Sequence, residues 1–593
     1  MVDFCNKRPY STKQNPPFHP AQISHMSDHW PDKVDHLQVF FGVPLAWGGD
    51  HWPDNVDHLQ GLQTVDWICI GIYACVTIGI GWYFGRRQRS TKEYFVGRGN
   101  MNPVLIGISL FVTLLSTISY LSKPGEALGK GPVLLTGLLA LPFAYWIVGY
   151  VLLPVYMRHR VTSAYELLES RLGLGIRLLG AAMFIALRLV WMSLLVYLAA
   201  KAMIVMMGID EQWIPLVVLI TGFVAVIYTS VGGLQAVVVT DTLQFLLLLG
   251  GALLVLAMIT FQMDGFSWFP TEWHPQWDTQ PIISFDPRTR LSVVGMLFMM
   301  VTWIVCTAGG DQTSVQRFMA TRNATSARHA YAIQLIASAF VTIVLGLVGF
   351  ALLGFFEAYP DQLPEDMNLY KDADDIFPWY IAHRLPVGIA GLVVSAMFAA
   401  AMSSIDSGVN SITAVVMSDF LDRFGKQPAT ERGHILAAKL LAFLIGTIVV
   451  VGSSFMGVIP GNITAVTNKT VSLLTSPIFG LFFFALFVPF VKPVAVWLAT
   501  FLGIITAVVI AFSGPLVTWL HLHWGIRSET FGVSLQEKLD EATGEISLLA
   551  PDPISFQWIG PAALLVIIVT GVGLSWILSR IQPPKHPEHS SSR

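Results

Sequence analysis

The sequence predicts an all-α polytopic membrane protein, and two observations carry this prediction. Of the 593 residues, 54% are hydrophobic and only 12% are charged, whereas a soluble globular domain carries about 25% charged residues. The apolar residues also gather in runs of roughly 20, which is the length of helix that crosses the hydrocarbon core of a bilayer. This composition excludes a disordered chain and an ordinary soluble enzyme. The net charge of -3 offers no basic surface for nucleic acid.

We count thirteen such runs, and sequence patterns locate their boundaries to within about four residues. Three of them are longer than a single crossing needs, which indicates tilt or extra turns outside the lipid. The predicted spans are 64–84, 103–121, 132–156, 176–206, 213–231, 236–261, 291–311, 329–357, 386–418, 436–456, 465–489, 493–519 and 556–579.

The basic residues of the short loops predict how these spans are oriented. Lys and Arg gather in the cytoplasmic loops of membrane proteins, and in this chain they occupy alternate loops. These basic residues are Arg86, Arg87, Arg89, Lys92 and Arg98 after the first span, Arg158, Arg160 and Arg171 after the third, Arg317, Arg322 and Arg328 after the seventh, and Arg423, Lys426 and Arg432 after the ninth. The N-terminus is therefore predicted outside and the C-terminus inside a plasma membrane or bacterial inner membrane.

Polar segments flank the predicted membrane domain of residues 64–580. Residues 1–63 are predicted to form a disordered extension, in which DHWPDKVDHLQ at 28–38 is nearly repeated as DHWPDNVDHLQ at 50–60. The repeat has two interpretations: a metal-binding tail that uses His29, His36, His51 and His58, or a local duplication without function. The spacing of the histidines lacks the tight pattern of a zinc site, which favours the duplication. Residues 581–593 are predicted to form a short cytoplasmic tail.

Polar residues inside the apolar runs mark the places where chemistry is expected, because burying such groups in a membrane is costly. The run at 386–418 contains Ser403, Ser404, Asp406 and Ser407 within five positions. Hydroxyl and carboxylate oxygens are ligands that suit a hard cation. The alternative is a seam of small residues that packs against a neighbouring helix. An aspartate at this depth favours the cation site.

Two further charged residues allow two interpretations each. Asp241 follows Gly232 and Gly233, which predict a tight intracellular turn. Its carboxylate is either a ligand for a cation or proton or a helix-end group that reaches water. Arg188, in the run at 176–206, either neutralises an anionic substrate or pairs with a carboxylate from another helix. The chain contains neither a G-x-x-x-x-G-K-[ST] loop nor an H-E-x-x-H motif, so the sequence does not predict an enzyme or an ATP-driven pump.

Four segments together resemble the sodium/solute symporter family, whose members include sodium-coupled carriers of sugars, proline, iodide, sialic acid and monocarboxylates. YTSVGGLQAVVVTDTLQ resembles the family signature Y-x-x-x-G-G-L-x-A-V-x-x-T-D-x-x-Q, and SAMFAAAMSSIDSGVNSITAVVMSDF is similar to its Ala-rich helix with two adjacent serines. STKEYFVGRG, followed by NMNPVLIGISL, resembles the entry to the first core helix, and DQTSVQRFMATRN resembles a Q-x-x-x-Q-R segment. The resemblance covers residues 64–580.

The resemblance implies the leucine-transporter fold, in which two inverted repeats of five helices surround a site at mid-membrane. The repeats are expected at about 103–261 and 291–489. A polar break is expected early in each repeat, at Thr113 to Ser116 and at Thr307 to Gln312. Gly232–Gly233 and Gly309–Gly310 are the candidate points of flexing.

The resemblance also implies two cation sites. The family's common sodium site corresponds here to the carbonyls of Val112, Leu115 and Ala400 and the hydroxyls of Ser403 and Ser404. A second site of some members corresponds to Asp241, Asp406 and Ser407. This chain has Asp406 where those members have serine, and two carboxylates at one site repel each other or strengthen cation binding. Coupling to protons instead of sodium therefore stays open.

The sequence thus predicts a secondary active symporter that imports a small organic solute with sodium. Sodium is expected as a transported ion, and no prosthetic group is expected. A substrate pocket is expected at Ser119, Arg188, Trp191, Ile304, Thr307 and Ser338. This pocket is too apolar for a polyhydroxyl ligand, whose hydroxyls would lose water without gaining partners. An organic acid or amino acid is therefore favoured over the alternative, a sugar or polyol.

Overall fold

The computed structural model describes residues 62–581 except 89, 98, 116, 160, 162, 208, 366, 427, 429, 457–462 and 540–545. The chain divides into two compact units, 1–58 and 59–593, and all described residues belong to the second. The predicted N-terminal extension lies outside the described residues apart from Leu62 and Gln63, and so do its repeat, its four histidines and the predicted tail after residue 581.

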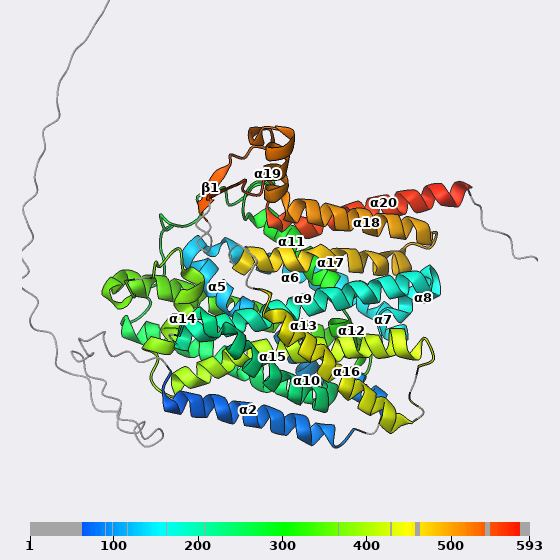
Figure 1. The fold of residues 1–593 in the computed structure, drawn as a ribbon, viewed down its shortest axis with the longest axis horizontal. Helices are drawn as coiled ribbons and strands as arrows, with labels where there is room; N and C mark the ends of the chain where they lie inside the picture. The colour runs from blue at the N-terminus through cyan, green and yellow to red at the C-terminus, as the bar shows by residue number, and fades with distance from the viewer. Residues whose placement is uncertain are drawn as a thin grey trace, which may run out of the picture. The chain divides into compact units, whose positions relative to one another are not determined.

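The regular elements of the first part of the described chain are all helices (Figure 1). Its elements are α2 (Thr64–Gly85), α3 (Thr91–Val96), α4 (Pro103–Leu114), α5 (Thr117–Lys130), the 3₁₀ helix η2 (Pro132–Ala140), α6 (Leu141–Trp146), the π-helix η3 (Ile147–Leu152), α7 (Leu153–His159), α8 (Glu166–Leu172), α9 (Leu174–Met207), the 3₁₀ helix η4 (Glu211–Trp213) and α10 (Ile214–Gln262).

The second part adds further helices and one small antiparallel sheet, in which Gln536 pairs with Leu549. Its elements are α11 (Val293–Gly310), α12 (Gln312–Met319), α13 (Ala324–Ala358), η5 (Pro360–Gln362), α14 (Ala373–Arg384), α15 (Ile389–Val415), the π-helix η6 (Val416–Asp422), α16 (Glu431–Ser453), α17 (Ile463–Phe487), α18 (Pro493–Ala511), α19 (Ser513–Trp524), η8 (Ser528–Phe531), β1 (Gln536–Leu539), β2 (Ile546–Leu549), η9 (Phe556–Trp558) and α20 (Ile559–Ile581).

Most of the predicted spans correspond to helices of the structure. Within the described residues, eleven helices are long and apolar enough to cross a membrane. The predicted span 103–121 is instead a broken pair, α4 and α5, which bend by 62° across the break. The predicted span 213–231 begins as a shorter apolar helix, Glu211–Ile227. The total of thirteen spans and the orientation of the termini stay predictions.

The predicted polar breaks are confirmed. α4 begins after Asn102, whose side chain accepts a hydrogen bond from the amide of Val104, and ends at Leu114. α5 resumes at Thr117, and α11 and α12 are separated by Asp311 alone. The expected flex point at Gly233 is a kink inside α10, where φ is 63° and ψ is -175°. Only glycine adopts such a conformation readily.

One predicted span boundary is wrong. The span expected at 493–519 ends at Ala511, because Phe512 leaves the helical conformation with φ -116° and ψ 31°. The chain then starts a separate helix, α19, at Ser513. The apolar composition of 513–519 continues that of α18, so hydropathy alone could not separate the two helices.

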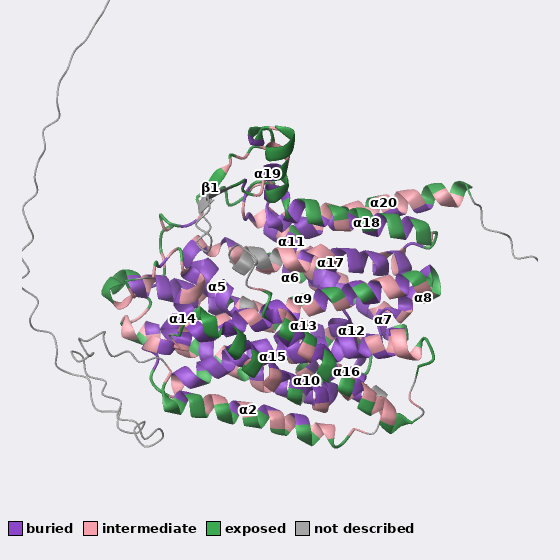
Figure 2. Cartoon of the chain, viewed as in Figure 1, coloured by how far each residue is buried: buried purple, intermediate pink, exposed green. Residues whose placement is uncertain are grey.

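α15 lies at the centre of the helices and α2 at their edge (Figure 2). In its most apolar stretch, 89% of the residues of the α15–η6 segment are buried, against 17% for α2. α2 is nevertheless fixed to α15 through Asp66, whose Oδ1 accepts hydrogen bonds from the amides of Gly388 and Gly391, both at 2.7 Å. The carboxylate thereby satisfies amides at the start of α15 that have no partner within the helix. Asp66 thus joins the peripheral helix α2 to the start of the buried helix α15.

Candidate cation and substrate site

Two serines of α15 contact the end of α4 at its break. Ser403 Oγ donates a hydrogen bond to the carbonyl of Val112 at 2.9 Å, and Ser404 Oγ donates one to the carbonyl of Thr113 at 3.3 Å. Carbonyls in the last turn of a helix lack their usual amide partners, so they are available to other donors or to a cation. Leu115 directly follows α4 with extended backbone, φ -84° and ψ 105°. The predicted ligand Ala400 lies one turn before Ser403 on α15.

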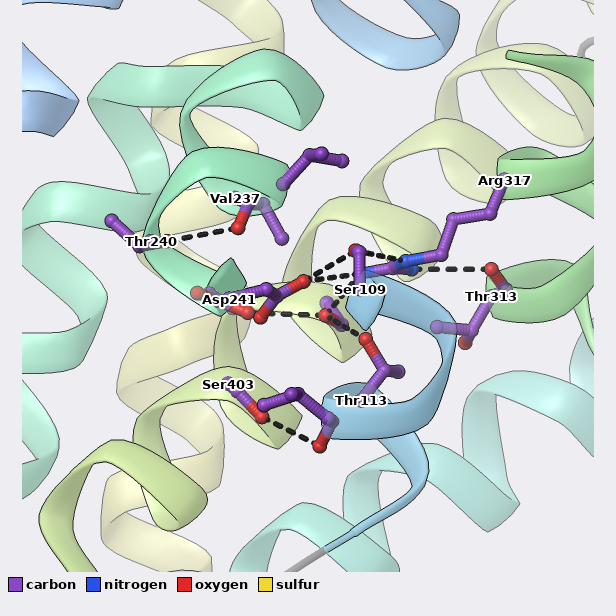
Figure 3. Close-up of polar contacts among 12 residues, drawn as sticks. Ser109, Thr113, Val237, Thr240, Asp241, Thr313, Arg317 and Ser403 are labelled. Carbon is purple, nitrogen blue, oxygen red and sulfur yellow. Dashed lines mark hydrogen bonds and ion pairs between the residues drawn. The ribbon is translucent and has the colours of Figure 1, made fainter. Parts of the chain in front are cut away.

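A buried arginine occupies the region of the predicted second cation site (Figure 3). Arg317 of α12 contacts Asp241 of α10, with 3.4 Å between Nη2 and Oδ2, and both residues are fully buried. Ser109 of α4 joins the pair, because it accepts a hydrogen bond from Arg317 Nε at 2.8 Å and donates one to Asp241 Oδ2 at 2.5 Å. The carboxylate and the guanidinium therefore share one hydroxyl.

The same cluster continues to α15 through Ser407. Arg317 Nη2 donates to Ser407 Oγ at 2.5 Å, and Ser407 Oγ lies 3.1 Å from Asp406 Oδ1 and 2.9 Å from Thr113 Oγ1. The structure thus brings together Asp241, Asp406 and Ser407, the three residues predicted for the second site. Thr113 connects them to the end of α4, because its carbonyl also accepts the hydroxyl of Ser404.

Sequence reasoning missed Arg317 as a site residue. The sequence predicts it in a loop, as one of the charges that define the cytoplasmic side, but it is fully buried on α12. That assignment is wrong, and Arg322 and Arg328 remain as the basic residues of this segment. The interpretation of Asp241 as a helix-end carboxylate that reaches water is also wrong, since none of its surface is exposed.

One carboxylate oxygen of this cluster suits a cation. Asp241 Oδ1 is buried and accepts no hydrogen bond from any described residue. Because a buried carboxylate oxygen without a partner is costly, this atom is suited to a further donor or a cation.

A cavity of about 210 Å³ lies beside the break of α4. Leu115 and Thr113 line it, so it borders the segment that carries the predicted sodium ligands. All six residues of the predicted substrate pocket line this one cavity, namely Ser119, Arg188, Trp191, Ile304, Thr307 and Ser338. The structure thus brings these residues together from several separate helices, and their role in binding the substrate stays a prediction.

Arg188 has a carboxylate partner within the cavity. Its Nη2 forms an ion pair with Asp311 Oδ2, and both residues are largely buried. Asp311 also caps α12, because its Oδ1 accepts a hydrogen bond from the amide of Thr313 at 2.8 Å. The structure thus confirms the second interpretation of Arg188, in which it pairs with a carboxylate from another part of the chain. Sequence reasoning missed Asp311, whose position in the α11–α12 break was the available signal.

Comparisons with known proteins agree with this arrangement. Residues 94–510 match the profile of the sodium:solute symporter family. The sodium/sialic acid symporter of Aliivibrio fischeri is 30% identical over 447 residues, which cover 72% of this chain and 83% of the relative. The human sodium-coupled monocarboxylate transporter 2 is 25% identical over 461 residues, covering 75% of this chain and 71% of the relative.

A solved structure shares the fold. It is the substrate-bound, outward-open state of a Na⁺-coupled sialic acid symporter, with a TM-score of 0.69 and 24% identity, and the match covers 87% of this chain and 98% of that one. This likeness confirms the all-α, leucine-transporter-like fold. The fold and the family match together define an integral membrane transporter rather than an enzyme. The chain belongs to the sodium:solute symporter family and is a sodium-coupled symporter.

The pair between Arg188 and Asp311 predicts a characteristic response to mutation. Asp311→Asn keeps an oxygen for the α12 cap but leaves Arg188 buried without a counter-charge, which is expected to cost about 3–5 kcal/mol of stability. The double variant Arg188→Gln with Asp311→Asn removes both charges and is expected to recover most of that loss. Thermal unfolding of the purified protein measures both effects. Equal destabilisation of the single and double variants would contradict the pairing.

Proposed function

We propose that this symporter imports a small organic acid or amino acid together with sodium by alternating access. The observation that carries the proposal is the junction of α4 and α15, where carbonyl and hydroxyl oxygens meet beside a cavity that contains basic side chains. The names of two relatives add support, because one carries sialic acid and the other monocarboxylates. A sugar or polyol is the alternative substrate class.

The first sodium site in this proposal consists of the carbonyls of Val112, Leu115 and Ala400 and the hydroxyls of Ser403 and Ser404. These are five neutral oxygens, and hard oxygen ligands suit a hard cation. The C-terminal end of α4 adds the negative end of its helix dipole. Without a full carboxylate in the set, the site holds sodium weakly enough to release it on the opposite side.

Sodium at this site would couple the two repeats. It would join the end of α4 to α15 and so fix the segment that lines the substrate cavity, which reduces the cost of ordering the pocket when substrate binds. The membrane potential contributes about 2.3 kcal/mol per charge per 100 mV to inward movement of the ion. Inward rocking then carries the sodium and the substrate together.

A second cation site is proposed at Asp241, Asp406 and Ser407. The Oδ1 atom of Asp241, which has no hydrogen-bond partner among the described residues, supports it, because a monovalent cation would supply that partner. Protons are the alternative to sodium at this site, because a buried carboxylate pair can also take up a proton.

The substrate class and the coupling ion can be tested together. Purified protein is expected to gain thermal stability from an organic acid or amino acid in sodium, but not in potassium, because a ligand that binds only the sodium-loaded protein stabilises it only there. The panel comprises lactate, sialic acid, proline and galactose. Stabilisation by galactose alone would favour the sugar alternative. No sodium effect with any compound would contradict the proposal.

The first site predicts that Ser403→Ala weakens sodium binding. Loss of one of five ligands is expected to raise the sodium concentration for half-maximal transport by about 10-fold, roughly 1.4 kcal/mol. The matched control is Ser395→Ala, because Ser395 lies on the same helix, is equally buried and donates only to the carbonyl of Gly391 in its own helix, at 2.7 Å. Uptake into proteoliposomes measures both. If the two variants have the same sodium dependence, the first site is wrong.

The second site predicts that Asp241→Asn reduces the number of sodium ions moved per substrate. The stoichiometry is expected to fall from two to one, while transport through the first site persists. Thr240→Val is the control, since Thr240 donates only to carbonyls of its own helix, Ala236 and Val237. Reversal potentials of reconstituted protein give the stoichiometry. An unchanged sodium count would refute the second sodium site, and transport driven by a pH gradient without sodium would favour the proton alternative.

A further inference from the structure

A second basic side chain, Lys123 of α5, also lines the substrate cavity. Its Nζ donates a hydrogen bond of 2.7 Å to the hydroxyl of Thr342 on α13, and Thr342 lines the same cavity. No carboxylate among the described residues lies within ion-pair distance of this ammonium. Lys123 thus has one neutral partner, and that partner faces the same space.

The nearby carboxylates are already paired with other residues. Asp311, the one acidic residue among those that line the described cavity, forms the ion pair with Arg188. Glu126 lies one turn beyond Lys123 on α5 but pairs with Arg290, with 2.6 Å between Nη1 and Oε1. The cavity therefore contains two positive charges and one negative charge, and the surplus positive charge belongs to Lys123 rather than to Arg188.

A charge enclosed in a protein is costly unless a counter-charge or several hydrogen bonds compensate it. Thr342 provides one hydrogen bond from a neutral group, whereas an ammonium has three N–H donors. A carboxylate in the cavity would accept the remaining donors in charge-assisted hydrogen bonds, which are the strong kind. An anion that enters the cavity would thus satisfy both the charge and the remaining donors of Lys123.

We propose that Lys123 and Thr342 bind the carboxylate of the transported substrate, and that they select a monocarboxylate over zwitterions and neutral solutes. One carboxylate balances the charge of the cavity. A zwitterionic amino acid would add an ammonium, for which the only lining carboxylate, Asp311, is already paired. A sugar would leave Lys123 without a counter-charge. This inference rests on the proposed function and narrows its substrate class.

Apolar side chains surround this polar pair and set the remaining specificity. Leu115, Leu138, Leu187, Trp191 and Trp303 line the rest of the cavity together with scattered hydroxyls. Apolar walls with a few fixed polar groups are typical of small-molecule sites, in which the polar groups determine orientation. The carboxylate end of the substrate is accordingly directed toward α5 and α13, and its remainder packs on the leucine and tryptophan side chains.

The test measures equilibrium binding of radiolabelled lactate and sialic acid to purified full-length protein in sodium. Wild type is expected to prefer each acid that it binds over the neutral amide of the same acid. Lys123→Gln is expected to weaken binding of that acid by about 10- to 100-fold, which is the usual contribution of a hydrogen bond to a charged group. The same variant is expected to lose the preference for the acid over its amide. Lys123→Arg is expected to restore part of the affinity. Lys130→Gln, on the same helix but away from the cavity, is the matched control.

Each outcome supports or overturns the inference. Stabilisation of the Lys123→Gln variant by sodium alone shows that it is folded and that its sodium site is intact. If that variant binds the acid as tightly as wild type and still prefers it to the amide, Lys123 is not the carboxylate partner, although the proposed function stands. If wild type binds neither acid in sodium, the inference of a monocarboxylate substrate is wrong, and stabilisation by proline in sodium would then show that the proposed function stands with an amino acid as substrate.

Discussion

Where α4 stops at Leu114, its last carbonyls lose their amide donors inside the protein, and the hydroxyls of Ser403 and Ser404 meet two of them. A buried carbonyl without a partner costs about 1–3 kcal/mol, so these two donors from α15 stabilise the break. The chain bends by 62° between α4 and α5 at this point, and Leu115 of the break lines the cavity.

The carbonyls at the second break accept hydrogen bonds from tyrosines rather than serines, and this difference affects how well each break can bind an ion. At the end of α11, the phenol of Tyr156 donates to the carbonyl of Gly309, and the phenol of Tyr165 donates to that of Gly310 at 3.0 Å. Both tyrosines are fully buried, which holds these caps in place. Small serine hydroxyls can turn from donating to a carbonyl to coordinating a cation beside it. The first break is therefore the better place for a transported ion.

The sequence alone predicted those features of the fold that depend on a few neighbouring residues, namely the apolar spans and the helix breaks. Runs of apolar residues located most of the spans, and the polar residues near Thr113 and Gly309 located both breaks, because hydropathy and backbone preferences act over a few residues. The partners of buried charges could not be found in this way. Arg317 follows polar residues in the sequence and resembles a loop arginine, and only the folding of α12 against α4 and α10 brings it to Asp241. The pairing of Arg188 with Asp311, 123 positions away, is equally a property of the tertiary structure.

The cavity borders both the break that carries the proposed sodium ligands and the residues proposed to bind the substrate. Leu115 belongs to the proposed sodium ligands and also lines the cavity, and Thr307 and Asp311 bring the second break to the same space. An ion that fixes the end of α4 therefore fixes one wall of the substrate pocket. A substrate that binds Lys123 and Thr342 as proposed would contact α5, the other helix of the bend. Because binding free energies are reciprocal, a sodium ion that raises the affinity for the substrate in this way would bind more tightly when the substrate is present, which is the coupling that a symporter requires.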